Sequence, residues 1–263
     1  MESQKLEISL PRVSVIIPAY NEQKWLKKTV SSVLKSGFPS ELIVVDDGST
    51  DKTPRILQSF GAKIKLITHP QNKGKGAAIA SGIKNASGEI IIFLDAHLLG
   101  LNREHLISLV LPLINGSAKV VLGEGVPYKI SLTKAFSPFL ILTGQRAYWK
   151  KDLLPLVPKI ENLGYGLEIF LFNKFRNSKT AIVSLPGLKH LVKKDTSSPT
   201  AATFSYLKET KEIFSALAKT QNITPKEFKQ LKRTFTSLWR EYLSQGRKKA
   251  KKYFEPLKKF LLE

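Results

Sequence analysis

Two adjacent carboxylates, Asp46 and Asp47, follow a short apolar run and are themselves followed by Gly48 and Ser49. A carboxylate in this position suits nucleoside recognition, because it accepts hydrogen bonds from a base N–H or from ribose hydroxyls. Gly48 lets the backbone turn and approach a ligand closely. The same four residues also form a common surface turn, so this segment alone leaves both interpretations open.

A second polar segment, Asn72-Lys-Gly-Lys-Gly76, stands before a stretch with helical spacing. Backbone amides at a helix N-terminus, together with lysine, favour phosphate. The segment is not a P-loop, because the Gly-Lys-Ser/Thr ending is missing. A flexible basic loop is the alternative interpretation.

Asp95 and His97 flank Ala96 directly after five apolar residues. A carboxylate and an imidazole two positions apart in an extended turn can face one divalent ion, and that ion could bridge a diphosphate. A departing diphosphate needs its charge neutralised, and a metal ion and lysine are the groups expected to do so. An exposed loop histidine is the alternative for His97.

The elements that must hold these segments alternate in type. Strands are expected over 13–17, 42–45, 64–67, 90–94 and 120–122, and helices over 22–34, 53–60, 74–85 and 103–114. Continuous apolar strands separated by helices predict an α/β fold with a mostly parallel, doubly wound sheet and helices on both faces. Ligands of such sheets bind beyond the carboxyl ends of the strands. The polar segments follow those ends, so we expect one site there.

Taken together and in order, four segments resemble family-2 glycosyltransferases of the GT-A fold. They are Val13-Ser-Val-Ile-Ile-Pro-Ala-Tyr-Asn-Glu22, Val44-Val-Asp-Asp-Gly-Ser-Thr-Asp51, Asn72-Lys-Gly-Lys-Gly-Ala-Ala78 and Phe93-Leu-Asp-Ala-His97. The resemblance covers about the first half of the chain and implies inverting transfer of a sugar from a UDP- or GDP-sugar. It also implies nucleotide-binding residues, which are Pro18, Ala19, Tyr20, Glu22, Asp47, Lys75 and Asp95.

By the same resemblance, Asp95 is the first member of the Asp-x-Asp metal motif of the family. The second member is His97 in this chain. Imidazole is a poorer ligand for a hard cation than carboxylate. This favours Mn over Mg as the divalent cofactor, or it indicates a degenerate site. The resemblance extends to a late basic segment and suggests His190 as a further metal ligand.

The second half resembles the family more loosely. The segment from Thr143 to Leu153 is similar to the acceptor side of polyprenyl-phosphate glycosyltransferases such as dolichyl-phosphate mannose synthases. That similarity implies that Arg146 meets the acceptor phosphate, a task that suits a guanidinium fork. Glu168 matches an acidic helix position near the acceptor and is a candidate general base. A helix-face Glu paired with a Lys is the alternative.

The net charge of +21 predicts an anionic partner, and part of that charge lies in residues 201–263, with 15 Lys and Arg against 6 Asp and Glu. Apolar stripes there predict basic amphipathic helices that contact an anionic membrane surface or pack on the core. Nucleic acid ranks behind a membrane and phosphorylated molecules, because aromatic residues do not interleave with the basic ones. The chain has no Cys, which excludes disulfides and thiolate metal sites.

We therefore expect a nucleotide-sugar-binding half over 1–123, an acceptor-binding half over 124–200 and a basic helical tail over 201–263. Residues 1–10 lack an apolar signal core, and no apolar run is long enough to span a bilayer. A cytoplasmic enzyme, peripheral on the inner face of the membrane, is the expectation. The leading acceptor is a polyprenyl or dolichyl phosphate or another membrane-associated acceptor. The alternatives are a soluble or glycan hydroxyl with Glu168 as base, and a non-catalytic nucleotide-sugar or polyanion binder.

Overall fold

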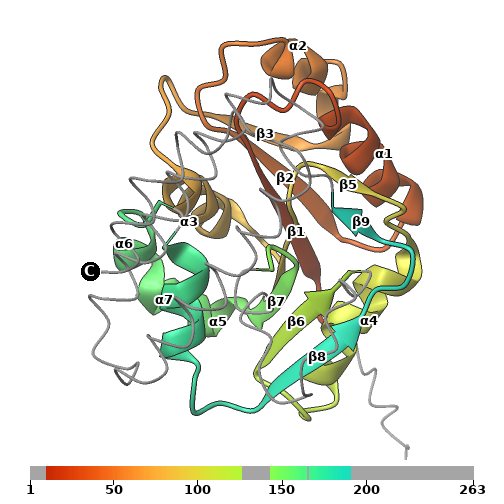
Figure 1. The fold of residues 1–263 in the computed structure, drawn as a ribbon, viewed down its shortest axis with the longest axis vertical. Helices are drawn as coiled ribbons and strands as arrows, with labels where there is room; N and C mark the ends of the chain where they lie inside the picture. Colours follow the sequence, from red (N-terminus) through yellow and green to blue (C-terminus); the bar gives the residue numbers. More distant parts are fainter. Residues whose placement is uncertain (1–9, 126–142, 165, 191–263) are drawn as a thin grey trace, which may run out of the picture.

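The computed structural model describes residues 10–125, 143–164 and 166–190, in which one large sheet lies between two layers of helices (Figure 1). The predicted tail over 201–263 lies outside the described residues. Within these residues no helix combines the length and the apolar character needed to cross a bilayer.

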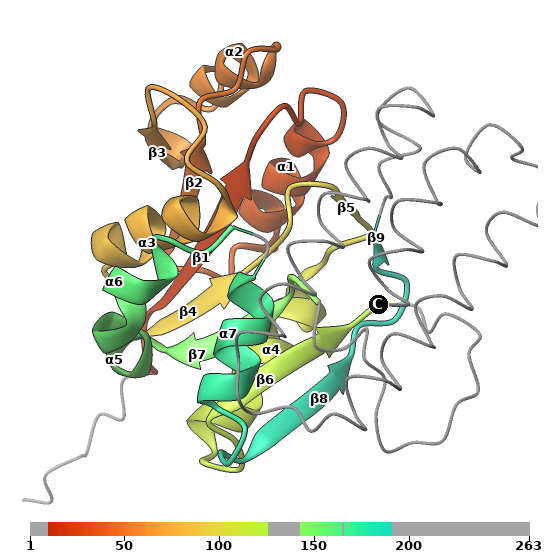
Figure 2. The same cartoon turned by 60° about the vertical axis from the view of Figure 1, so that its left-hand side comes forward.

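The large sheet has seven strands in the order β3-β2-β1-β4-β7-β6-β8. They are β1 (Val13–Ala19), β2 (Glu41–Asp46), β3 (Lys65–Thr68), β4 (Ile90–Phe93), β6 (Val120–Glu124), β7 (Arg146–Trp149) and β8 (Thr180–Ser184). Only β7 runs against its neighbours in this sheet. A small antiparallel sheet joins β5 (Leu98–Leu99) to β9 (Lys189–His190) beside the upper part of the main sheet (Figure 2).

The central strands β1, β2 and β4 are buried on both faces because their apolar residues are continuous. On β1, Val15 and Ile17 belong to one hydrophobic cluster while Ile16 belongs to the other. On β4, Ile92 and Phe93 divide between the clusters in the same way. This period of two fixes the register, since a slip of one residue would exchange the two faces.

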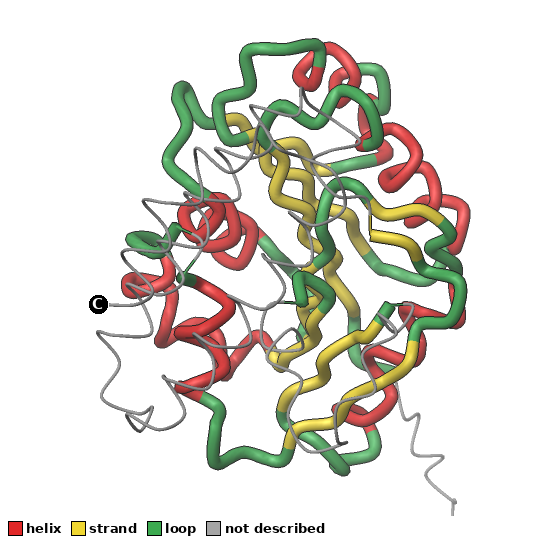
Figure 3. Tube along the Cα trace, viewed as in Figure 1, coloured by secondary structure: helices red, strands yellow, loops and turns green. Residues whose placement is uncertain are grey.

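Helices cover both faces of the sheet (Figure 3). One layer contains α1 (Leu26–Ser36), α2 (Thr53–Gln58) and α4 (Arg103–Ile114), and the other contains α3 (Lys75–Asn85), α5 (Lys150–Leu153), α6 (Val157–Ile160) and α7 (Leu167–Lys174). The described residues also contain the 3₁₀ turns Gly61–Lys63 and Leu154–Leu156. Local signals set helix ends: Asn102 caps α4 through its side chain, and α1 stops at Gly37 in the left-handed region.

The predicted doubly wound sheet with helices on both faces is confirmed. The expected strands and helices of the first half are present, with ends shifted by a few residues. The irregular stretch after Glu124 contains β7, β8 and α5 to α7, which are short and follow no clear period. The predicted boundary between 123 and 124 falls inside β6, and strands from both sides of it belong to one sheet.

Candidate active site

The loops after β1 and β2 are joined to each other at the carboxyl edge of the sheet. The Asp47 backbone N–H donates to the Ala19 carbonyl at 2.9 Å. The Asn21 N–H donates to Ser49 Oγ at 2.9 Å, and the Thr50 N–H donates to Asn21 Oδ1 at the same distance. These hydrogen bonds hold the two loops rigidly together. We call the predicted nucleoside-binding part of them, residues 18–22 and Asp47, the rim.

Within this rim the predicted residues differ in accessibility. Ala19 is buried in β1, Pro18 is half-buried, and Tyr20 is 45% exposed. The Tyr20 ring is thus available to a ligand at the edge of the site.

Glu22 connects the first loop to the loop that follows β4. Its Oε1 lies 3.2 Å from His97 Nδ1, and both side chains are about four-fifths buried. Burial lowers the pKa of His97, but the Glu22 hydrogen bond and the nearby carboxylates of Asp95 and Glu22 outweigh it, so the pKa is raised. A divalent ion would have to displace the proton from this ring, because only the neutral imidazole coordinates a metal.

The two tandem carboxylates have separate structural tasks. Asp46 Oδ1 accepts from the Ser49 N–H at 3.1 Å and closes its own turn. Gly48 in that turn has φ 71°, and a Cβ there would lie 2.4 Å from the carbonyl carbon of Gln71. Only glycine allows the turn to close against the neighbouring loop.

Asp47 holds the loop that precedes α3. Its Oδ1 accepts from the Lys73 N–H at 3.0 Å, and its Oδ2 accepts from the Gly74 N–H at 2.7 Å. His69 Nδ1 lies 2.6 Å from the same Oδ1. The carboxylate is therefore an anchor that fixes where α3 begins.

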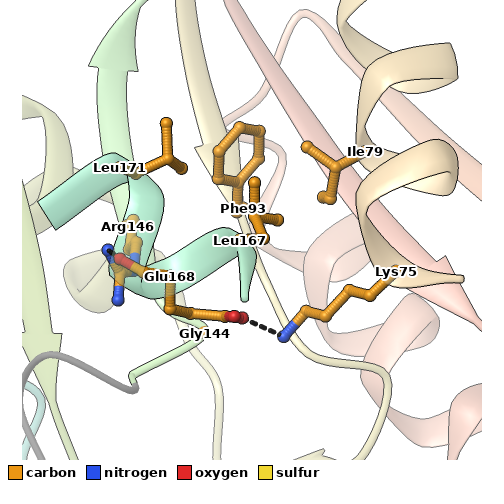
Figure 4. Close-up of a pocket in the computed structure, with 8 residues that line it drawn as sticks. All are labelled: Lys75, Ile79, Phe93, Gly144, Arg146, Leu167, Glu168 and Leu171. Carbon is orange, nitrogen blue, oxygen red and sulfur yellow. Dashed lines mark hydrogen bonds and ion pairs between the residues drawn. The ribbon is translucent and has the colours of Figure 1, made fainter. Parts of the chain in front are cut away.

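Lys75 is the first residue of α3, and its ammonium joins two carboxylates. Nζ lies 2.9 Å from Asp95 Oδ1. It also lies 2.6 Å from Glu168 Oε1, and Figure 4 shows this second pair. Burial lowers the pKa of Lys75, but the charges of Asp95 and Glu168 outweigh burial and raise it far above the usual range. Lys75 therefore keeps its positive charge. Its ammonium lies between Asp95, on the predicted donor side, and Glu168, on the predicted acceptor side.

Asp95 is held on its other side by the segment before β7. Gln145 Nε2 donates to Asp95 Oδ2 at 3.0 Å, and Thr143 Oγ1 donates to Gln145 Oε1 at 3.0 Å. A Cβ at Gly144 would lie 2.0 Å from Asp95 Oδ2. The sequence analysis gave Gly144 and Gln145 no role. The only signal that could have identified them is a glycine and a side-chain amide directly before Arg146.

Arg146 contacts the backbone of Glu168 and is 2% exposed. Its Nε donates to the Thr143 carbonyl at 2.7 Å, and its Nη1 donates to the Glu168 carbonyl at 3.2 Å. In this structure the guanidinium donates to backbone carbonyls, and its direct contact with an acceptor phosphate stays a prediction. Its observed effect is to tie the first turn of α7 to the loop that holds Asp95.

A small cavity adjoins this cluster. Apolar side chains contribute much of its lining, and Ile79, Phe93, Leu167 and Leu171 face it together with Lys75, Gly144, Arg146 and Glu168 (Figure 4). An apolar wall lowers the local dielectric constant and so strengthens the Lys75 ion pairs.

Thr29 on α1 fixes the loop that carries Asp95 and His97. Its buried Oγ1 donates to the Ala96 carbonyl at 2.9 Å and accepts from the Leu98 N–H at 3.0 Å. Sequence reasoning missed this residue, although a hydroxyl on the apolar stripe of a helix is a detectable signal.

The predicted metal ligands come from two segments that the small sheet brings together. The backbone of His190 in β9 pairs with Leu98, the residue after His97. Across the described residues, no three or more Asp, Glu, His or Cys side chains form a ready cage for an ion. Asp95 and His97 stay predicted ligands, for an ion that would arrive on a diphosphate whose oxygens supply the remaining ligands.

The model of the family described as Glycosyl transferase family 2 matches residues 14–176, which include the rim, Lys75, Asp95 and Glu168. An uncharacterized glycosyltransferase of Rickettsia typhi is 34% identical over 164 residues, which are 61% of this chain and 50% of the relative. Human dolichyl-phosphate beta-glucosyltransferase is 38% identical over 99 residues, 32% of this chain and 31% of the relative. The chain thus spans half or less of these relatives.

Among solved structures, glucosyl-3-phosphoglycerate synthase from Mycobacterium tuberculosis is similar over most of its length. In its complex with Mn²⁺, UDP-glucose and glycerol 3-phosphate it is 25% identical to this chain, with a TM-score of 0.61 and coverage of 82% of both chains.

Proposed function

Because this chain belongs to glycosyl transferase family 2, we propose that it moves a sugar from a nucleoside diphosphate sugar to an acceptor, with inversion at the anomeric carbon. One observation carries the proposal. The Lys75 ammonium joins Asp95, at the end of β4, to Glu168, in the first turn of α7. Donor-side and acceptor-side groups therefore meet at one point, as direct displacement requires.

The nucleoside is assigned to the rim formed by residues 18–22 and Asp47. Asp47 accepts three hydrogen bonds from protein groups, and a carboxylate has about four acceptor positions. One position remains, which suits the single imide N–H of uracil better than the two adjacent N–H donors of guanine. The UDP-glucose in the mycobacterial synthase supports uridine as well.

The diphosphate is assigned to the start of α3, where the helix dipole favours an anion, and to Lys75, whose ammonium would exchange a contact with Asp95 or Glu168 for one with the phosphate. Asp95 and His97, with His190 as a further candidate, would hold the divalent ion, Mn or Mg. When bound, such an ion neutralises charge on the departing diphosphate. The Mn²⁺ in the mycobacterial complex supports a divalent ion here.

The leading acceptor is a polyprenyl or dolichyl phosphate. The similarity to the human dolichyl-phosphate enzyme and the net charge of +21 support it. A phosphate oxygen is already ionised at neutral pH, so this reaction needs positioning and no general base. In this assignment Arg146 acts indirectly, by holding the turn of α7 that faces the acceptor. Peripheral contact with an anionic membrane would bring the enzyme to such an acceptor.

A hydroxyl acceptor is the second candidate, and the position of Glu168 favours it. Its carboxylate is 9% exposed and lies 2.6 Å from Lys75, within the same cluster as Asp95. A hydroxyl must lose a proton as it attacks, and Glu168 would accept that proton. The mycobacterial synthase was solved with glycerol 3-phosphate, which carries both a phosphate and hydroxyls.

The test is release of UDP or GDP from UDP-glucose and GDP-mannose with Mn²⁺, in the presence of undecaprenyl phosphate or glycerol 3-phosphate. We expect the wild type to release the nucleoside diphosphate with one donor and one acceptor, and Asp95→Ala to release almost none. Donor binding without release under any of these conditions would contradict a transferase and would support the non-catalytic binder.

A further inference from the structure

His69 is a buried residue directly after β3 that the proposed reaction does not use. Its side chain is 8% exposed, and its backbone N–H donates to the Asp46 carbonyl at 2.8 Å. The ring bridges two elements: Nδ1 lies 2.6 Å from Asp47 Oδ1, and Nε2 lies 2.9 Å from Ser81 Oγ.

These contacts fix the direction of each hydrogen bond in the neutral ring. A carboxylate only accepts, so Nδ1 carries the proton that is donated to Asp47. Nε2 then accepts from the Ser81 hydroxyl, on the body of α3. One imidazole thus connects the helix to the carboxylate that organises the start of the same helix.

The connection continues from Asp47 to the donor site. The carboxylate that His69 orients also accepts the N–H groups of Lys73 and Gly74. Gly74 has φ 96° and directly precedes Lys75. A rotation of the Asp47 carboxylate would release these two amides and shift the residue from which the Lys75 side chain extends.

We propose that His69 is a positioning residue for the nucleoside diphosphate: by orienting Asp47 it holds the 72–74 loop and Lys75 in the geometry that binds the donor. The inference rests on the proposed function. His69 acts through Asp47 and needs no contact with the ligand.

Two substitutions separate the two bonds of the ring. His69→Asn places an amide N–H near the position of Nδ1, which keeps the bond to Asp47 and loses the bond to Ser81. His69→Gln places its amide near the position of Nε2, which keeps the hydrogen bond to Ser81 and loses the hydrogen bond to Asp47. Ser81→Ala is the matched control, because it removes the partner of Nε2 alone.

The measurement is the Kd of UDP with Mn²⁺ by isothermal titration calorimetry, with the Tm of each ligand-free variant recorded beside it. We expect His69→Gln to raise the Kd by about tenfold or more, and His69→Asn and Ser81→Ala to stay within about threefold of the wild type. His69→Leu, which makes neither bond, should behave as His69→Gln does and replaces that variant if it does not fold.

Equal Kd values for His69→Asn and for the variants that lose the Asp47 bond would overturn the inference, as would a fall in Tm with unchanged Kd. A wild type that binds neither UDP nor GDP would overturn the proposed function itself. That second result is visible before any variant is made, so the two failures are distinguishable.

Discussion

Lys75 Nζ lies 2.6 Å from Glu168 Oε1, which ties the first residue of α3 to the first turn of α7 across the carboxyl edge of the sheet. The same ammonium lies 2.9 Å from Asp95 Oδ1. A single positive charge therefore sets the separation of two carboxylates that would otherwise repel each other. This relationship makes the cluster a unit, and variants of its members should not behave independently.

Lys75→Met should lower both the turnover of the donor and the stability of the fold. The two carboxylates would lose their shared counter-charge in a poorly solvated site, so we expect the free energy of unfolding to fall by about 2 kcal/mol and turnover to fall by about 100-fold or more. Urea denaturation and a UDP-release assay measure the two effects. Lys84→Met is the control on the same helix, because the Lys84–Glu161 pair has Nζ and Oε2 2.7 Å apart but is exposed. Similar losses for both variants would contradict a special role for Lys75.

Gly144→Ala should displace Asp95. The added methyl would lie 2.0 Å from the Asp95 carboxylate, too close for either group to remain in place. We expect the KM for the donor to rise and turnover to fall by about tenfold or more. Gly61→Ala provides the comparison, because it introduces backbone strain at φ 53° with open space around the new methyl. Unchanged kinetics for Gly144→Ala would refute the packing of Asp95 on this glycine.

Much of the donor site could be predicted from the sequence because its parts are local. Continuous apolar runs identify β1, β2 and β4, and the polar residues after each run necessarily share one edge of a parallel sheet. The acceptor side could not be predicted in the same way. Gln145 meets Asp95 across 50 residues of sequence, and that contact depends on β7 running antiparallel between β4 and β6. Strand insertion of this kind has no local signature.

Arg146 illustrates the same limit. Its residue type suggests a phosphate ligand, whereas its burial at the start of a central strand and its hydrogen bonds to the Thr143 and Glu168 carbonyls could not be predicted from the sequence. His69 and Thr29 differ from Arg146, because their residue types suggest no particular role. Both are polar residues beside apolar runs, and the sequence does not reveal their hydrogen-bond partners.

Glu41 should stabilise the fold in a pH-dependent way, far from the site. Partial burial raises the pKa of Glu41, but hydrogen bonds from Ser14, Ser87 and Gly88 outweigh it, so the pKa is lowered in the folded state. A depressed carboxyl pKa contributes stability above the unfolded value of about 4.3, and that stability is lost as the pH falls through the folded pKa. Glu41→Gln should therefore lower the Tm at pH 7 and lower it much less near pH 3. A Tm difference that stays constant between these pH values would contradict this account.

Glu168→Gln distinguishes the two candidate acceptors. If the acceptor is a hydroxyl, loss of the base should lower kcat by about 100-fold or more. If the acceptor is a lipid phosphate, the reaction should retain most of its rate, because no proton has to be removed. The measurement is UDP release with glycerol 3-phosphate and with undecaprenyl phosphate in detergent. Glu161→Gln, at an exposed carboxylate, serves as the control and should leave both rates unchanged.

The most direct test of the account is a crystal structure of the protein with UDP and Mn²⁺. We predict that the uracil lies against the rim of residues 18–22 and Asp47, that a diphosphate oxygen is within hydrogen-bond distance of Lys75 Nζ, and that the ion contacts Asp95 or His97. A nucleotide bound elsewhere, with Lys75 still closed on Asp95 and Glu168, would contradict the assignment of this edge of the sheet to donor binding.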